Sequence, residues 1–157
     1  MNGILNGFKD FFTNYLLVSA MLGWFSAQII KIFTGLYQDK KKTLRSILFS
    51  TGGMPSSHSA TVLALTTSAA FKHGLNSSIF AVCAILSMVV MIDASGVRYE
   101  TGKQAVLLNK ITKEIFSGKP ELMNSGLKEL VGQTPFQVFM GALLGIGFGI
   151  AMFFIMR

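Results

Sequence analysis

Charged residues are scarce in this sequence, and acidic ones most of all. Only 13% of the 157 residues are charged, with 14 Lys and Arg against 7 Asp and Glu, whereas soluble domains carry about 25%. Almost no charge falls in four apolar stretches, which are Tyr15 to Leu36, Ala60 to Phe71, Ile79 to Ile92 and Phe136 to Met156. This pattern excludes an ordinary soluble domain and predicts an integral membrane protein with four transmembrane helices.

Cysteine and histidine are also rare. The single cysteine, Cys83, excludes an intrachain disulfide. The two histidines, His58 and His73, lie far apart, and no carboxylates are paired closely in the sequence, so no cluster has the ligand spacing of a metal site. We therefore expect no metal and no other cofactor.

The net charge of +7 has two interpretations. A basic protein can bind nucleic acid, but here the Lys and Arg residues cluster beside the apolar stretches, as the positive-inside rule and anionic lipid headgroups favour. We therefore expect the lipid bilayer, and no nucleic acid, as a partner. The basic segment Gln38 to Arg45 then lies in the cytoplasm. With four spans, this orientation brings one end of every span to the cytoplasmic membrane face.

A chain of this length fits one membrane domain, residues 1–157, with an all-α four-helix bundle as its fold. Short interfacial helices are expected outside the bundle. Residues 2–12 place their apolar side chains on one helical side. A polar insertion, residues 99–132 between spans three and four, predicts two further helices, Lys103 to Phe116 and Glu121 to Val131.

Residues that favour helix ends set the limits of the spans. Gly74 is a candidate stop for the second span, and the run Asn76-Ser77-Ser78 supplies candidate caps for the third. Thr134 is a candidate cap for the last span, with Pro135 at a tolerated first-turn position.

The last span carries Gly141, Gly145 and Gly149 at every fourth position. Such a strip lets another helix approach closely. We expect its partner to be a neighbouring span of the same chain. The alternative is a homo-oligomer contact, which would suit a structural or assembly subunit.

The stretch from Gly52 to Ala60 combines a glycine pair, a proline, two adjacent hydroxyls and an imidazole directly before an apolar run. This composition predicts a turn followed by a helix N-terminus. The free N–H groups and the helix dipole favour phosphate there, and Ser56, Ser57 and His58 add donors or a proton. The same residues would also suit an ordinary helix cap with a surface histidine.

Further polar side chains are expected at the same membrane face. Lys31 lies near the end of the first span, Asp93 and Arg98 follow the third, and Gln133 and Gln137 flank the start of the last. Cations, hydroxyls and an imidazole at a membrane boundary suit the phosphate ester of a lipid. Two assignments keep a structural alternative, since Lys31 can snorkel to the boundary and Asp93 can form an internal salt bridge with Arg98.

Four strings carry a resemblance to a known family. They are Gly-Gly-Met-Pro-Ser-Ser-His-Ser-Ala (52–60), Asp-Ala-Ser-Gly-Val-Arg (93–98), Gly-Lys-Gln-Ala (102–105) with Asn109, and Gly-Gln-Thr-Pro-Phe-Gln-Val (132–138). Pro55-Ser56-Ser57-His58 resembles the Pro-Ser-Gly-His motif of the type 2 phosphatidic acid phosphatase and vanadium haloperoxidase superfamily. Together the strings resemble its divergent bacterial and plant branch.

The resemblance implies a metal-independent lipid phosphate or pyrophosphate phosphatase, acting on a lipid such as phosphatidic acid or a polyprenyl phosphate. His58 matches the general acid of the family. The implied phosphate-binding residues are Lys31, Ser56, Ser57, Ser95 and Arg98. We expect a bacterial cytoplasmic membrane, and the positive-inside rule predicts that the site faces the cytoplasm.

The resemblance ends at the attacking residue. Gln133 occupies the position of the family's nucleophilic His, and Gln137 that of the acid that orients it. An amide nitrogen is not basic and cannot form a phosphoenzyme as imidazole does. Three explanations stay open: a natural non-hydrolytic relative, inactivating substitutions, or catalysis by His58 alone or with Asp93. A phosphatase-like protein, a non-catalytic phospholipid-binding or transport protein, and an assembly subunit are therefore all candidates.

Overall fold

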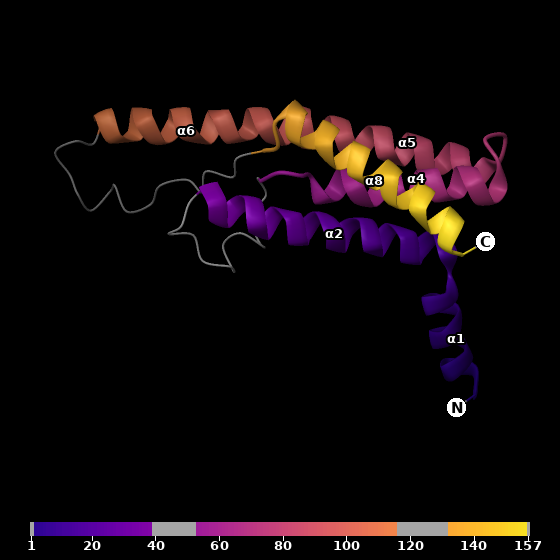
Figure 1. Cartoon of the computed structure of the whole chain (residues 1–157). Helices are drawn as coiled ribbons and strands as arrows, with labels where there is room; N and C mark the ends of the chain where they lie inside the picture. Colours follow the sequence, from indigo (N-terminus) through magenta and orange to yellow (C-terminus); the bar gives the residue numbers. More distant parts are fainter. Residues whose placement is uncertain (1, 39–52, 116–131, 157) are drawn as a thin grey trace.

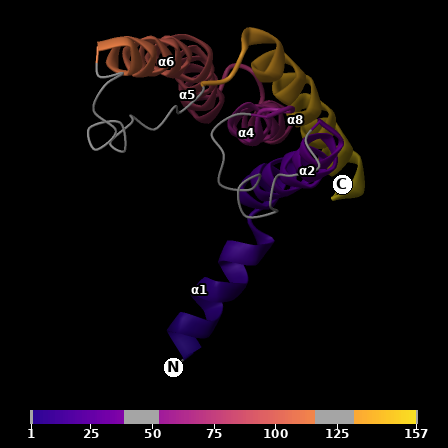
Figure 2. The same ribbon diagram turned by 90° about the vertical axis from the view of Figure 1, so that its left-hand side faces the viewer.

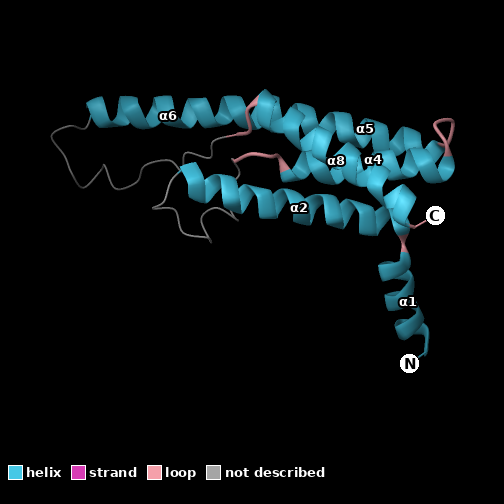
Figure 3. Cartoon of the chain, in the orientation of Figure 1, coloured by secondary structure: helices cyan, strands magenta, loops and turns pink. Residues whose placement is uncertain are grey.

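The computed structural model describes residues 2–38, 53–115 and 132–156, and every regular element in this part of the chain is a helix (Figures 1 and 3). The predicted all-α class is confirmed. The elements are α1 (Asn2–Thr13), α2 (Tyr15–Gln38), α4 (Ser57–His73), α5 (Ser78–Ile92), the π-helical turn η1 (Asp93–Val97), α6 (Arg98–Ile115) and α8 (Pro135–Ile155).

Helix α4 is the centre of the bundle, because it packs against α2, α5 and α8 (Figure 2). Its limits are set locally. The Ser56 side chain caps the first turn by accepting a hydrogen bond from the N–H of Ser59, and Gly74 ends the helix with a positive φ of 81°. Helix α8 starts with the predicted Thr134 cap, which forms a capping box with Gln137.

The interior of the bundle holds small side chains, and the large apolar ones face outward. The fully buried residues include Ala27, Ala60, Ser19, Ser59 and Ser68. Large exposed apolar side chains include Trp24, Phe25, Phe33, Val82 and Phe154. In water this distribution would be unfavourable, but a bilayer solvates apolar side chains and favours close packing of small ones. The burial pattern therefore agrees with a membrane protein.

The glycine strip of α8 lies against α4. A Cβ at Gly141 would overlap the backbone oxygen of Ser56, and one at Gly145 would overlap that of Ala60. Gly149 faces Thr67 in the same way. The strip is therefore occupied within the chain, and the alternative contact with a second copy would require α4 to leave it.

Helices α5 and α6 form one continuous rod through η1 (Figure 1). The predicted helix Lys103 to Phe116 is present as part of α6, but its start at Lys103, apart from the third span, is wrong. Helical hydrogen bonding continues through the π turn, where the Arg98 N–H bonds to the Asp93 carbonyl, so α6 begins at Arg98. The segment Ser78–Thr112 has 35 residues and is about 52 Å long. One of its ends therefore extends beyond a hydrocarbon core of about 30 Å.

Three segments of the described residues are long and apolar enough to cross a membrane: Tyr15–Gly35, Ser78–Thr112 and Pro135–Ile155. Helix α4 has only 17 residues and is not one of them. Because three helices surround it, α4 can be rich in Ser, Thr and Ala. That it spans the membrane as the fourth helix stays a prediction.

Helix α1 extends away from the bundle (Figures 1 and 2), and its range matches the helix predicted for residues 2–12. The Asn14 side chain starts α2 by accepting a hydrogen bond from the N–H of Leu16. Two other predictions, the basic segment Gln38 to Arg45 and the helix Glu121 to Val131, lie at or outside the limits of the described residues.

Candidate functional site

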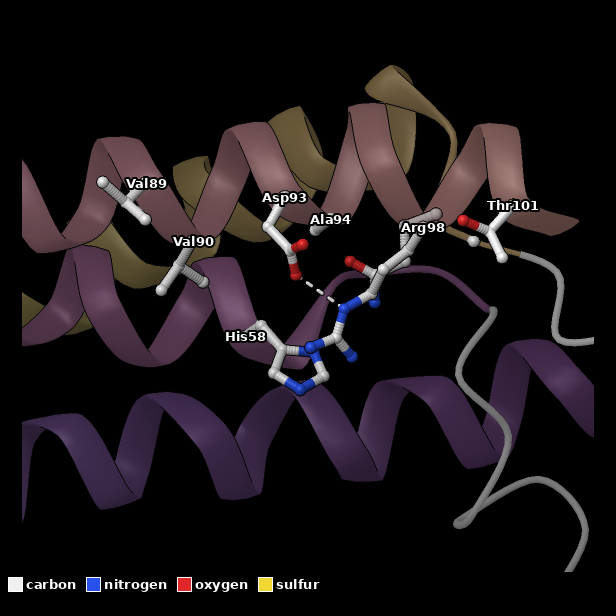
Figure 4. Close-up of a pocket in the computed structure, with 9 residues that line it drawn as sticks. His58, Val89, Val90, Asp93, Ala94, Arg98 and Thr101 are labelled. Atoms are coloured by element: carbon white, nitrogen blue, oxygen red, sulfur yellow. Dashed lines mark hydrogen bonds and ion pairs between the residues drawn. The ribbon is translucent and has the colours of Figure 1, made fainter.

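A pocket of about 470 Å³ lies beside the first turn of α4, where α5 continues through η1 into α6. Figure 4 shows the His58, Asp93 and Arg98 side chains at this pocket, with Val89 and Val90 beside them. The lining residues are His58, Val89, Val90, Asp93, Ala94, Arg98, Thr101, Gly132 and Gln133. Four of the predicted site residues therefore share one pocket.

The π turn brings Asp93 and Arg98 together. In a regular α-helix, side chains five residues apart point about 140° away from each other. The wider π turn reduces this angle, and the Arg98 Nε donates to the Asp93 carboxylate at 2.6 Å. Both side chains are about half exposed, at 57% and 42%. The salt bridge that we considered as an alternative is present, and it forms part of the pocket wall.

Gly132 and Gln133 reach the pocket because the segment before α8 passes close to the rod. A Cβ at Gly132 would overlap the backbone of Arg98 and Tyr99. The Gln133 N–H then donates to the Ala94 carbonyl at 3.2 Å. Glycine at position 132 thus permits the close approach that places Gln133 at the pocket.

A hydrogen-bonded chain connects Gln133 to the start of α4. Ser59 donates to the Ser56 hydroxyl through its N–H at 3.2 Å and through its own hydroxyl at 2.9 Å. The Ser56 hydroxyl in turn donates to Gln133 Oε1 at 2.5 Å. Both Ser56 and Gln133 are almost fully buried. Ser56 is therefore used by the protein itself and is not available as a direct phosphate ligand in this arrangement.

His58 has the opposite environment, because its side chain is exposed at the pocket. It is the one imidazole among the described lining residues. The charges of Arg98, Lys31 and Asp93 all act on it. In Figure 4 the Arg98 guanidinium points toward His58. A proton-carrying group and a fixed cation thus face the same space.

Lys31 is buried beside the turn that precedes α4, and only 4% of it is exposed. Its aliphatic chain packs against Gly53, where a Cβ would lie 2.7 Å from Lys31 Cε. Gly53 also has a φ of 111°, which favours glycine. Lys31 does not line the described pocket, although its charge acts on His58.

Three further predicted site residues do not line the pocket either. Ser57 is buried in the first turn of α4. Ser95 donates its hydroxyl proton to the Met91 carbonyl at 2.8 Å, which is a bond within the helix. Gln137 accepts from the Thr134 N–H at 3.0 Å through its side-chain oxygen and completes the cap of α8.

Several lining residues were not predicted from the sequence. Thr101 lies one helical turn after Arg98, so the three-residue spacing is a signal that could have identified it. Val89, Val90 and Ala94 form an apolar wall. Ala94 belongs to the family string 93–98, whereas Val89 and Val90 look like any other residues of a membrane span. No sequence signal distinguishes them.

The chemistry of the pocket suits an anion. Arg98, His58, Thr101 and the Gln133 amide can all donate hydrogen bonds, against one carboxylate, Asp93. In the described part of the chain, no three His, Cys, Asp or Glu side chains gather closely enough to hold a metal ion.

An apolar exterior, three long apolar helices and a tightly packed interior of small residues define an integral membrane protein. The chain belongs to the Divergent PAP2 family, which matches residues 12–148. It is also similar to a protein of Bacillus subtilis (strain 168) named "Uncharacterized membrane protein YuiD", with 41% identity over 147 residues that cover 87% of this chain and 92% of the relative. No solved structure matches it. The resemblance found in the sequence is confirmed at the level of the family.

Proposed function

We propose that this protein binds the phosphate or pyrophosphate headgroup of a membrane lipid in the pocket beside α4. The observation that carries the proposal is the meeting of the Arg98 guanidinium and the His58 imidazole in a pocket with an apolar wall. Such a pocket offers positive charge to a headgroup and apolar contact to the chain attached to it.

Most N–H groups of the Arg98 guanidinium are available to a ligand. Its Nε donates to Asp93, so the two terminal nitrogens, with four N–H groups, remain for phosphoryl oxygens. The side chain is 57% exposed, so a headgroup can reach it. Arg98 is therefore the principal phosphate contact in this proposal.

The apolar wall argues for a lipid over a soluble phosphate. Val89 and Val90 line the pocket, and the outer surface of α5 carries the exposed apolar side chains Val82, Ile85 and Leu86. An apolar surface thus extends along α5 from the lipid-facing side of the bundle to the pocket. A lipid chain gains free energy along such a surface, whereas inorganic phosphate gains none.

Headgroup binding does not need an attacking residue, whereas hydrolysis does. The family mechanism uses an imidazole nucleophile and a second imidazole as acid, but the described pocket holds one imidazole, His58. At the nucleophile position, Gln133 offers an amide whose oxygen already accepts a hydrogen bond from Ser56. Hydrolysis would have to rely on His58 alone or with Asp93.

The test uses the purified protein in nanodiscs, with phosphatidic acid, polyprenyl phosphate and neutral diacylglycerol as probes. We expect the two phosphorylated lipids to bind, and Arg98→Gln to weaken their binding about tenfold. The matched control is Lys103→Gln, since Lys103 forms a similarly exposed pair with Glu100 and does not line the pocket. Equal binding of diacylglycerol, or no effect of Arg98→Gln, would reject the proposal. Vanadate-sensitive phosphate release from the same samples would instead establish an enzyme.

The proposal includes a pocket that faces the cytoplasm of a bacterium. The end of the bundle that holds the pocket also carries several basic residues, as the positive-inside rule favours for a cytoplasmic face. They are Lys31, Arg98, Lys103 and Lys110. In a Cys83→Ser background, a cysteine introduced by Lys103→Cys should react with an impermeant thiol reagent only from the cytoplasmic side. Reaction from the outside would reverse the orientation.

A further inference from the structure

Gln133 is the lining residue that occupies the family's nucleophile position without being a nucleophile. Its side chain is almost completely buried, with 3% of the residue exposed, yet it contributes to the pocket wall. Its backbone is fixed by the hydrogen bond from its N–H to the Ala94 carbonyl. The backbone end of the Gln133 side chain is therefore fixed.

The hydrogen-bonded chain from α4 determines which way this amide points. A serine hydroxyl has one proton to donate and two lone pairs to accept with. Ser56 receives two hydrogen bonds, from the N–H and from the hydroxyl of Ser59, and these occupy both lone pairs. Its single proton goes to Gln133 Oε1, because an amide oxygen can only accept.

With Oε1 turned to Ser56, the Nε2 amide group carries two N–H donors that no described residue accepts. An unused donor beside a pocket is costly unless a ligand or solvent accepts its hydrogen bond. We propose that Gln133 is a ligand-binding residue whose Nε2 donates to a phosphoryl oxygen of the bound headgroup, with Ser56 and Ser59 as the residues that position it. This inference rests on the proposed function.

An amide at this position provides binding without attack on phosphorus. Nε2 is a neutral donor, so it stabilises an anionic oxygen, but its nitrogen lone pair is delocalised and is not nucleophilic. Together with Arg98 and His58, it would surround the headgroup from three sides, since these residues come from α6, α4 and the segment before α8. The Gln133 position thus becomes a recognition element for phosphate.

The decisive variant is Gln133→Glu, measured as the full-length protein in nanodiscs with phosphatidic acid. The carboxylate keeps an oxygen that can accept from Ser56, while both Nε2 donors disappear and a negative charge faces the phosphate. We expect binding at neutral pH to weaken at least about tenfold. Relative to the wild type at each pH, binding should recover as the pH falls and the introduced carboxylate is protonated. Thermal unfolding at each pH tests for a structural cause, since a carboxylate that only disrupts the fold would lower stability and binding together.

The matched control is Gln104→Glu, the same change on the exposed surface of α6 and away from the pocket. If Gln133→Glu does not fold, Gln133→Met removes the donors without adding charge and should weaken binding without pH recovery. Wild-type affinity in the Gln133 variant, with Arg98→Gln still impaired, would overturn the role of Gln133 and leave the proposed function standing. Failure of the wild type to bind phosphatidic acid would reject the proposed function itself.

Discussion

The start of α4 has two flanks that differ in almost every respect. On the closed flank, toward α8, Ser56 is fully buried, donates to Gln133 and packs against Gly141. On the open flank, toward the rod of α5 and α6, the exposed side chain of His58 faces Arg98 across the pocket. One helical turn thus carries a tightly packed contact on one side and a solvent-accessible site on the other.

The two flanks differ in what the loss of a side chain should change first, the stability of the fold or the binding of the ligand. Polar groups on the closed flank bond to one another, so their loss should affect folding first. On the open flank, the Asp93–Arg98 pair is about half exposed, and such pairs contribute little to stability. The closed flank therefore fixes the helix start, and the open flank can lose side chains with little effect on the fold.

The largest effect is expected where α8 contacts α4. Gly145→Leu would force a side chain against the Ala60 carbonyl, and we expect a cost of about 3 kcal/mol or more, because backbone atoms cannot move aside as side chains can. The control is Gly147→Leu, since nothing lies within 4 Å of a Cβ there. Thermal unfolding in detergent measures both variants. Equal stability of the two would mean that the closed flank is not tightly packed.

A smaller loss should follow from removal of the buried hydroxyl. Ser56→Ala removes the cap of α4 and leaves Gln133 Oε1 without its donor, which should cost about 2 kcal/mol. Ser77→Ala is the control, because Ser77 caps α5 without a buried partner and should cost about 1 kcal/mol. Chemical or thermal unfolding of both variants gives the comparison. If Ser56→Ala costs no more than Ser77→Ala, its bond to Gln133 adds nothing to stability.

Local signals in the sequence predict the helices well. Gly74 ends α4 and Thr134 starts α8 as expected, and the cap of α5, Ser77, comes from the predicted run Asn76-Ser77-Ser78. Such caps depend on backbone groups only a few residues away. The apolar stretches likewise give three segments that can span a membrane, since length and hydropathy determine this property. The family strings also contain four residues that line one pocket in the structure, His58, Asp93, Arg98 and Gln133.

Properties that depend on contacts between helices were not predictable. The π turn between Asp93 and Val97 has no sequence signal, yet it joins α5 to α6 and pairs Asp93 with Arg98. The Gln137 side chain completes a local cap instead of facing the pocket. Spacing along the sequence cannot show which polar side chains will form hydrogen bonds between helices. Ser56 is the clearest case, because its hydroxyl bonds to Gln133 instead of remaining free for phosphate.

The smallest effect concerns the carboxylate on the open flank. Asp93 holds the Arg98 guanidinium through Nε, so Asp93→Asn removes a negative charge that competes with phosphate for Arg98. We expect phosphatidic acid to bind about threefold more tightly, since exposed ion pairs are worth less than about 1 kcal/mol, with no change in thermal stability. Glu100→Gln, which frees Lys103 in the same way outside the pocket, should leave binding unchanged. Weaker binding after Asp93→Asn would show instead that Asp93 holds Arg98 in position for the ligand, and the open flank would then depend on its ion pair as the closed flank depends on Ser56.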